Sequence, residues 1–119
     1  EGTAEVLVAL ADVQVRDTVL WDLMQEEPSS WFAISERLAR VVAAAPDTHV
    51  AAPATLLAIL RWQVGDGSRA SAAVERALDA DPAYTLARLV DGCLATGMHP
   101  STWRSGLADL SREACRRAS

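Results

Sequence analysis

The residue types that most often carry out chemistry are few in this chain and widely spaced. Both histidines, His49 and His99, stand next to sequences that favour turns. Cys93 lies six residues before His99, and Cys115 lies sixteen residues after it. Structural zinc sites use tight pairs of Cys or His, which pre-arrange four ligands around the metal. No such pair is present in the sequence, so we expect no metal site, no cofactor and ordinary turn histidines.

Nucleophilic catalysis is also disfavoured by the sequence. No serine lies in a Gly-x-Ser-x-Gly elbow, and no motif places a base beside either cysteine. All eleven basic residues are arginine, so the chain has no lysine for Schiff-base chemistry. Cys93 shares a helical apolar stripe with neighbouring leucines, which predicts a buried small side chain. We therefore expect a protein that is not an enzyme.

The segment Gly65-Asp66-Gly67 invites comparison with a phosphate-binding loop. It follows a predicted helix rather than a strand, and it has neither a Walker lysine nor a third spaced glycine. Glycine is common just after the end of a helix, and Asp-Gly is common in turns. The segment predicts a helix stop followed by a turn.

Ionisable residues inside apolar stretches are candidates for buried interactions. Arg16-Asp17 and Asp91 are of this kind. A buried charge is generally retained only when it is paired, so we expect Arg16 to pair with Asp91 or Asp12 across helices. The expected role is to fix packing.

Four tryptophans, Trp21, Trp31, Trp62 and Trp103, are spread one per predicted helix. Filling the core is the first expectation, and acting as binding anchors is the alternative, because tryptophan is enriched in both settings. Exposed aromatic and arginine residues define a predicted interaction surface. Its members are Arg61, Trp62, Tyr84, Arg88, Trp103 and Arg104.

Apolar residues recur with helical spacing along the whole chain, which predicts an all-α bundle of about six antiparallel helices. The predicted helical segments are residues 5–27 in two pieces, 28–45, 53–64, 68–80, 82–96 and a final helix from Pro100 that buries Trp103, Leu107 and Leu110. Arg112, Arg116 and Arg117 complement the dipole at the end of this last helix.

Helix ends are marked by capping residues. Asp12, Ser68 and Asp81 are predicted N-caps, with Pro82 in the first helical position after Asp81. Gly65 and Gly97 are predicted C-terminal stops. Short connections follow, so consecutive helices should be antiparallel neighbours.

The overall composition limits what the protein can be. With 119 residues, half of them apolar, residues 1–119 should form a single domain. The net charge of −5 disfavours a nucleic-acid partner, and no apolar run is long enough for a membrane span. Two thiols fit a reducing cytoplasm. Because the first residue is Glu1, we expect the chain to be the C-terminal part of a longer protein.

Two resemblances support the helical reading. The segment from Leu57 to Leu94, with Gly65, Ala77-Leu78 and Asp81-Pro82, resembles a tetratricopeptide repeat and implies a helical hairpin. Over most of the chain, the order of several short motifs resembles the C-terminal half of the actinobacterial domain-of-unknown-function family DUF4192. These motifs are Val15-Arg16-Asp17, Trp21, Ala51-Ala52-Pro53-Ala54, Trp62 with Gly65-Asp66-Gly67, the run from Glu75 to Tyr84, and Pro100 with Trp103-Arg104. The family implies a fold and no assigned activity.

Three hypotheses for function follow. The first is a non-catalytic helical scaffold that receives a protein or peptide, including another domain of the same protein, in a groove between hairpins. The second is an accessory domain of an enzyme whose active site lies in an N-terminal part. The third is a homodimerisation domain, expected if the apolar helix from Pro53 to Val64 leaves a large uncovered patch.

Overall fold

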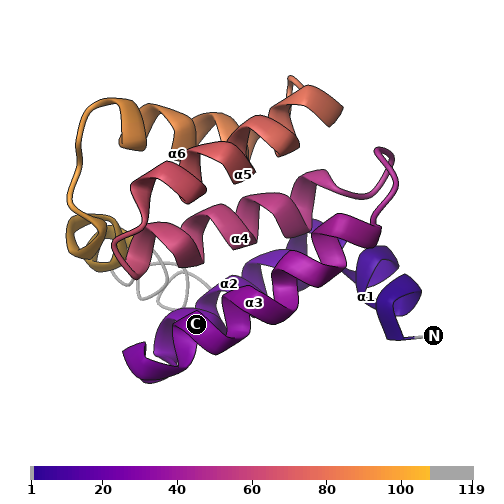
Figure 1. Ribbon diagram of the computed structural model, residues 1–119, viewed down its shortest axis with the longest axis horizontal. Helices are drawn as coiled ribbons and strands as arrows, with labels where there is room; N and C mark the ends of the chain where they lie inside the picture. Colours follow the sequence, from indigo (N-terminus) through magenta and orange to yellow (C-terminus); the bar gives the residue numbers. More distant parts are fainter. Residues whose placement is uncertain (1, 108–119) are drawn as a thin grey trace, which may run out of the picture.

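The computed structural model describes residues 2–107, and the chain is helical through most of that range (Figure 1). The all-α class is confirmed, because the described residues contain no β-strand. Six helices are α1 (Gly2–Leu10), α2 (Val13–Gln25), α3 (Pro28–Ala44), α4 (Ala51–Gln63), α5 (Gly67–Ala80) and α6 (Thr85–Ala95). Residues 100–107 form a further helical segment, which corresponds to the predicted final helix from Pro100. The predictions for Leu110, Arg112, Cys115, Arg116 and Arg117 lie outside the described residues.

Helix α4 is the centre of the molecule. Every residue from 52 to 60 is buried. Helices α3 and α5 pack on α4 with alternating chain direction, and α6 follows α5 in the same alternation (Figure 1). The sequence explains this placement, because α4 is apolar over most of its circumference and must be covered on several sides. Residues 52–60 leave no uncovered apolar patch, whereas Val64, just after the helix, is 38% exposed. Homodimerisation through this helix stays a prediction.

Small side chains allow three helices to approach one another closely. Ala54 on α4, Ala77 on α5 and Ala87 on α6 are all fully buried in one cluster. Alanine adds little volume at such a contact while preserving helix propensity. The alanine-rich composition of the chain is thus used at the crossing of α4, α5 and α6.

Several predicted helix ends are confirmed. Asp12 caps α2, with its carboxylate accepting hydrogen bonds from the backbone N–H groups of Gln14 and Val15. Gly65 ends α4 with φ of +88°, and Gly97 ends α6 with φ of +74°. These are left-handed conformations that favour glycine over residues with a Cβ atom.

Two predicted helix starts are wrong. Asp66, rather than Ser68, caps α5, because its side chain accepts from the backbone N–H of Arg69. Asp81 is the C-terminal cap of α5 rather than the N-cap of the next helix. Its carbonyl accepts from the N–H of Tyr84 in a turn, and α6 begins only at Thr85. The sequence favours a cap at an Asp-Pro pair, but the Asp81 carboxylate accepts from the N–H of Ala83 within the turn and does not cap α6.

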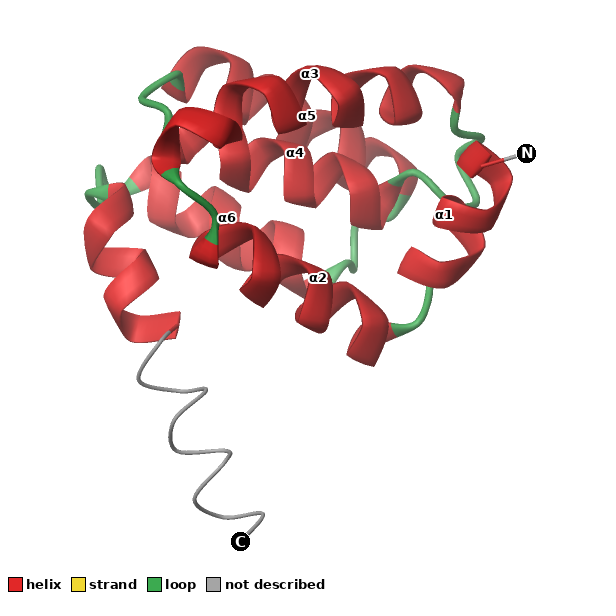
Figure 2. Cartoon of the chain, turned by 90° about the horizontal axis from the view of Figure 1, so that it is seen from below, coloured by secondary structure: helices red, strands yellow, loops and turns green. Residues whose placement is uncertain are grey.

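Helices α2 and α6 lie on the same side of the row formed by α3, α4 and α5 (Figure 2), and residues of both line one groove. They are separated in sequence by that whole row, so only the tertiary fold brings them to face each other. None of the described helices is both long and apolar enough to span a bilayer.

Candidate functional site

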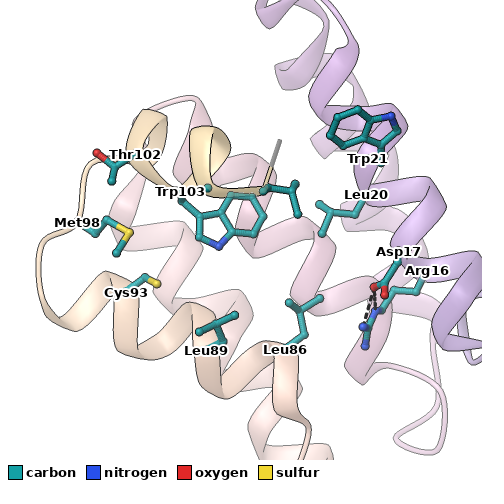
Figure 3. Close-up of a pocket in the computed structure, with 12 residues that line it drawn as sticks. Arg16, Asp17, Leu20, Trp21, Leu86, Leu89, Cys93, Met98, Thr102 and Trp103 are labelled. Atoms are coloured by element: carbon teal, nitrogen blue, oxygen red, sulfur yellow. Dashed lines mark hydrogen bonds and ion pairs between the residues drawn. The ribbon is translucent and has the colours of Figure 1, made fainter. Parts of the chain in front are cut away.

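An apolar groove lies between α2, α6 and the helix of residues 100–107, and we call it the α2–α6 groove. It has a volume of about 570 Å³, which is in the size range of ligand and peptide sites. The residues that line it are Arg16, Asp17, Leu20, Trp21, Leu86, Leu89, Cys93, Met98, Thr102, Trp103, Gly106 and Leu107 (Figure 3).

Helical periodicity places the lining residues of α2 on one face. Arg16 and Leu20 are four residues apart, as are Asp17 and Trp21, so the two pairs lie side by side along the helix. Leu20 is almost wholly buried and belongs to the main core. This wall is therefore apolar at its base and carries charge at one end.

The opposite wall combines buried and exposed apolar groups. Leu86, Leu89 and Cys93 recur along one face of α6, and Met98 follows in the turn after it. Cys93 is buried, whereas Leu89 is 55% exposed and Met98 is 36% exposed. A leucine with that exposure beside a tryptophan and a methionine forms an uncovered apolar rim.

Trp103 closes the groove from the helix of residues 100–107. Its ring centroid lies 5.8 Å from that of Trp62, with an interplanar angle of 49°. Trp62 is 5% exposed and packs with Ala70 and Cys93. The tilted pair of rings anchors Trp103 on the core, so the position of this wall is set by buried packing.

Arg104, on the same helix of residues 100–107, attaches this helix to its neighbours. Its Nη1 atom donates to Oε1 of Gln63 over 2.6 Å, and its guanidinium carbon lies 5.1 Å from the ring centroid of Trp31. The Nε1 atom of Trp31 donates to the carbonyl of Leu23 over 2.8 Å. Arg104 is thus a link between three helices rather than a free surface group.

The polar end of the groove is a network centred on Arg16. Its Nε and Nη2 atoms donate to Oδ1 of Asp17 over 3.0 and 2.7 Å. Its Nη1 atom donates to the hydroxyl of Tyr84 over 2.9 Å, and the guanidinium carbon lies 5.5 Å from the centroid of the Tyr84 ring. The expected pairing of Arg16 with Asp91 or Asp12 is wrong, because Asp12 caps α2 and the adjacent Asp17 supplies the carboxylate.

The network fixes Arg16 in its charged form. Burial is the largest single influence on the pKa of Arg16 and acts to lower it. The hydrogen bonds to Tyr84 and Asp17, with the accompanying electrostatic attraction, outweigh that influence and raise the pKa above its ordinary value. The guanidinium is therefore a permanent cation that holds Asp17 and Tyr84 together.

The six residues of the predicted interaction surface are separated by the fold. Trp103 lines the groove, and Tyr84 supports its polar end. Trp62 packs behind Trp103 and is too buried to touch a partner, whereas Arg104 extends from the Trp103 helix to Gln63 and Trp31. Arg88 is exposed and, like Arg61, is not among the lining residues.

Arg61 has an unusual environment of its own. Desolvation, and then the nearby charge of Arg69, lower its pKa, while Glu36 and Asp66 act in the opposite direction. Its buried Nε atom has no hydrogen-bond partner among the described residues. This arrangement lies at the α3, α4 and α5 side of the molecule, apart from the groove.

Sequence reasoning missed Leu89 and Met98 as site residues, because helical spacing places Leu89 on the same stripe as buried Val90 and Cys93. The width of the apolar stripe on this helix was the one feature of the sequence that could have indicated an exposed residue. Leu86, Leu89, Val90 and Cys93 span more of the helix surface than a single packing neighbour covers. Part of the stripe therefore has to face either another element or a groove.

The groups tested for chemistry remain apart in the structure. His49 is within 2.9 Å of the Thr48 hydroxyl, and His99 is within 2.7 Å of the Ser101 hydroxyl. In the part of the chain that the structure describes, no three His, Cys, Asp or Glu side chains are grouped as metal ligands would be. The groove itself offers an apolar surface with one charged pair.

Comparison with protein families matches residues 1–101 to the family described as "Domain of unknown function (DUF4192)". The matched range includes all of α1 to α6 and the start of the helix that carries Trp103. Searches of the curated proteins and of the solved structures found no match. The chain belongs to the DUF4192 family.

Proposed function

We propose that the protein is a non-catalytic helical scaffold whose α2–α6 groove binds an amphipathic segment of a protein partner, either another chain or another part of its own. One observation carries the proposal: Leu89 is 55% exposed on the rim of an otherwise packed apolar groove. Large apolar side chains that gather at a concave surface mark interaction sites more often than isolated exposed leucines do. Grooves between helices accept the apolar face of a partner helix through residues spaced three and four apart.

The walls of the groove favour binding over chemistry. Arg16 and Asp17 are bound to each other, and the remaining lining is almost entirely apolar. The walls are also held in place before binding, by the Trp62–Trp103 pair on one side and buried Leu20 on the other. A preformed apolar site loses little conformational entropy when a partner binds, which strengthens the net affinity.

The proposed scaffold also includes helices α4 and α5. We propose that α4 and α5 form a hairpin of the tetratricopeptide type, supported by the close packing of Ala70, Ala73 and Ala77 against α4. We also propose a cytoplasmic location, supported by the free thiol of Cys93.

The test uses a neutral apolar dye, Nile red, and a panel of fluorescent amphipathic peptides of roughly 14 residues, which is near the shortest length that is helical alone. Fluorescence of the dye and anisotropy of the peptides report binding to the full chain. Leu89→Glu places a charge on the rim and should weaken binding by about tenfold or more, equivalent to ~1.4 kcal/mol. Because Leu89 is exposed, the variant should keep its fold.

Phe32→Glu is the matched control, because Phe32 is 59% exposed on α3 and does not line the groove. It should bind the dye and the peptides as the parent does. Equal loss in both variants would show that binding is non-specific, and no binding of any probe by the parent protein would overturn the proposed function. Circular dichroism melts of all variants establish that each is folded.

A further inference from the structure

The charged pair at the end of the α2–α6 groove determines what kind of partner the groove can accept, provided that the proposed function holds. Asp17 is the more accessible member, with a side chain 58% exposed against 12% for Arg16. Both hydrogen bonds from Arg16 go to the same oxygen, Oδ1. Among the described residues, no hydrogen bond reaches Oδ2 of Asp17. Asp17 lines the groove (Figure 3), so its carboxylate has one oxygen left to accept a hydrogen bond from an occupant.

Arg16 does not offer a comparable site for an anion. Three of its nitrogens already donate to Asp17 or Tyr84, and its guanidinium lies near the Tyr84 ring. The two N–H groups that remain belong to a side chain that is only 12% exposed, and an incoming carboxylate or phosphate would lie beside the negative charge of Asp17. The polar group that the groove can offer to an occupant is an acceptor with negative charge.

The other lining residues determine a second property that an occupant of the groove must have. Leu86, Leu89, Met98 and Trp103 present apolar surface, so the occupant must contribute apolar side chains to cover them. The charge of the whole chain is −5, which attracts a basic partner over longer distances and repels an acidic one.

We propose that the partner segment carries a lysine or arginine next to its apolar face, and that this cation pairs with Oδ2 of Asp17 while the apolar side chains cover Leu89 and Trp103. The Arg16–Asp17–Tyr84 network then acts as a selectivity element. It holds the carboxylate at a fixed place, so that segments with a cation at the matching position are preferred over neutral or acidic ones.

The experiment compares three peptides of the helical panel that differ at one position, beside the apolar face, where the residue is Lys, Gln or Glu. The parent protein should bind the Lys peptide about three- to fivefold more tightly than the Gln peptide, as expected for a partly exposed ion pair. The Glu peptide should bind most weakly. At about 1 M salt, where the Debye length is ~3 Å, the preference should shrink.

Asp17→Asn removes the charge while leaving an amide oxygen to accept from Arg16, and it should reduce the Lys preference to near unity. Asp91→Asn is the matched control, because Asp91 is exposed on α6, does not line the groove and changes the net charge by the same amount. It should keep the preference.

The outcomes separate this inference from the proposed function. If all three peptides bind with equal affinity and Leu89→Glu still weakens them, the groove binds partners without charge selection and the inference is wrong. If Asp91→Asn removes the preference as well as Asp17→Asn does, the effect is one of net charge and the inference again fails. If no peptide binds, the proposed function fails first.

Discussion

Arg104 shows how much one side chain can contribute when it joins three helices. It donates to Gln63 and lies over the ring of Trp31. Arg104→Ala removes both contacts and leaves the buried side-chain oxygen of Gln63 without its donor. We expect the free energy of unfolding to fall by about 2 kcal/mol, from an unsatisfied buried polar group and a lost cation–π contact. Urea denaturation measures the change.

Arg88→Ala is the control for that experiment, because Arg88 is exposed on α6. Its effect should stay within roughly 0.5 kcal/mol, as for most surface substitutions. An equal loss in the two variants would show that Arg104 contributes only helix propensity or general charge.

The Arg16–Tyr84 contact supports a second prediction at this scale. Tyr84→Phe keeps the ring near the guanidinium and removes the hydroxyl that accepts from Nη1. We expect a loss of about 1 kcal/mol in stability, below the ~1.5–3 kcal/mol of a hydrogen bond to a charged group, because this contact is only part-buried. Leu89→Ala, on the exposed rim, should cost less and serves as the comparison.

The pH dependence of that loss follows from the raised pKa of Arg16. A base whose pKa is higher in the folded state contributes stability that is fully present below its unfolded pKa and is lost only as pH rises through the folded pKa. Both values lie in the strongly alkaline range of arginine. The difference between Tyr84→Phe and the parent should therefore be constant from about pH 6 to about pH 9, and a marked change across that interval would contradict the role assigned to Arg16.

At the scale of the helix, the turn between α4 and α5 provides a matched pair of glycines. Gly65 has φ of +88°, and Gly67 begins α5; a Cβ atom at either position would meet nothing within 4 Å. Gly65→Ala should therefore destabilise by about 1 kcal/mol through backbone conformation alone. Gly67→Ala should be neutral or stabilising by up to roughly 1 kcal/mol. Thermal melts of both variants test the opposite signs.

Helix α5 provides the test of close packing. Ala77 is fully buried among residues of α4 and α6, whereas Ala72 on the same helix is exposed. Ala77→Leu should destabilise by about 1–3 kcal/mol because the helices have to move apart. Ala72→Leu adds the same atoms in solvent and should be nearly neutral. Similar stabilities for the two variants would show that the α4–α5–α6 crossing adapts more readily than close packing implies.

For the whole molecule, burial predicts where local opening begins. In α4 every residue from 52 to 60 is buried, whereas α1 buries only Leu7 and Leu10 among the residues whose side chains are described. Amide hydrogen exchange should therefore be slowest in α4 and markedly faster in α1, because local stability follows buried apolar contact. Equal protection of α1 and α4 would indicate that α1 opens only together with the whole domain.

The ends of the helices show which structural features can be predicted from the local sequence. Asp12 and Gly65 act as predicted, since a cap and a left-handed glycine are decided by a few neighbouring atoms. Asp81 does not: it ends α5, its carboxylate accepts from the N–H of Ala83 in a turn, and this turn leads to Tyr84, whose hydroxyl contacts Arg16 sixty-eight residues away. Sequence patterns carry no information on such a contact.

Of the residues predicted for the site from the sequence, some line the groove and others have a structural role. Trp103 is predicted both to be buried by the last helix and to belong to the interaction surface, and it is half-buried and lines the groove. Trp62, from the same prediction, packs behind Trp103, and Arg104 links the Trp103 helix to Gln63 and Trp31. An aromatic or arginine side chain is equally suited to an interface and to a partly buried link. Only the packing of neighbouring helices determines which of the two it becomes.

The sequence by itself determined the helical class, the position of most helices and the family, because hydrophobic periodicity, caps and motif order are local properties of the chain. The tertiary structure alone decided that α2 faces α6, that Leu89 stays uncovered and that Arg16 joins Asp17 to Tyr84. The physical reason is that a groove is made of surfaces left over after packing. Which parts of an apolar stripe remain uncovered depends on the volumes and angles of all the helices around it.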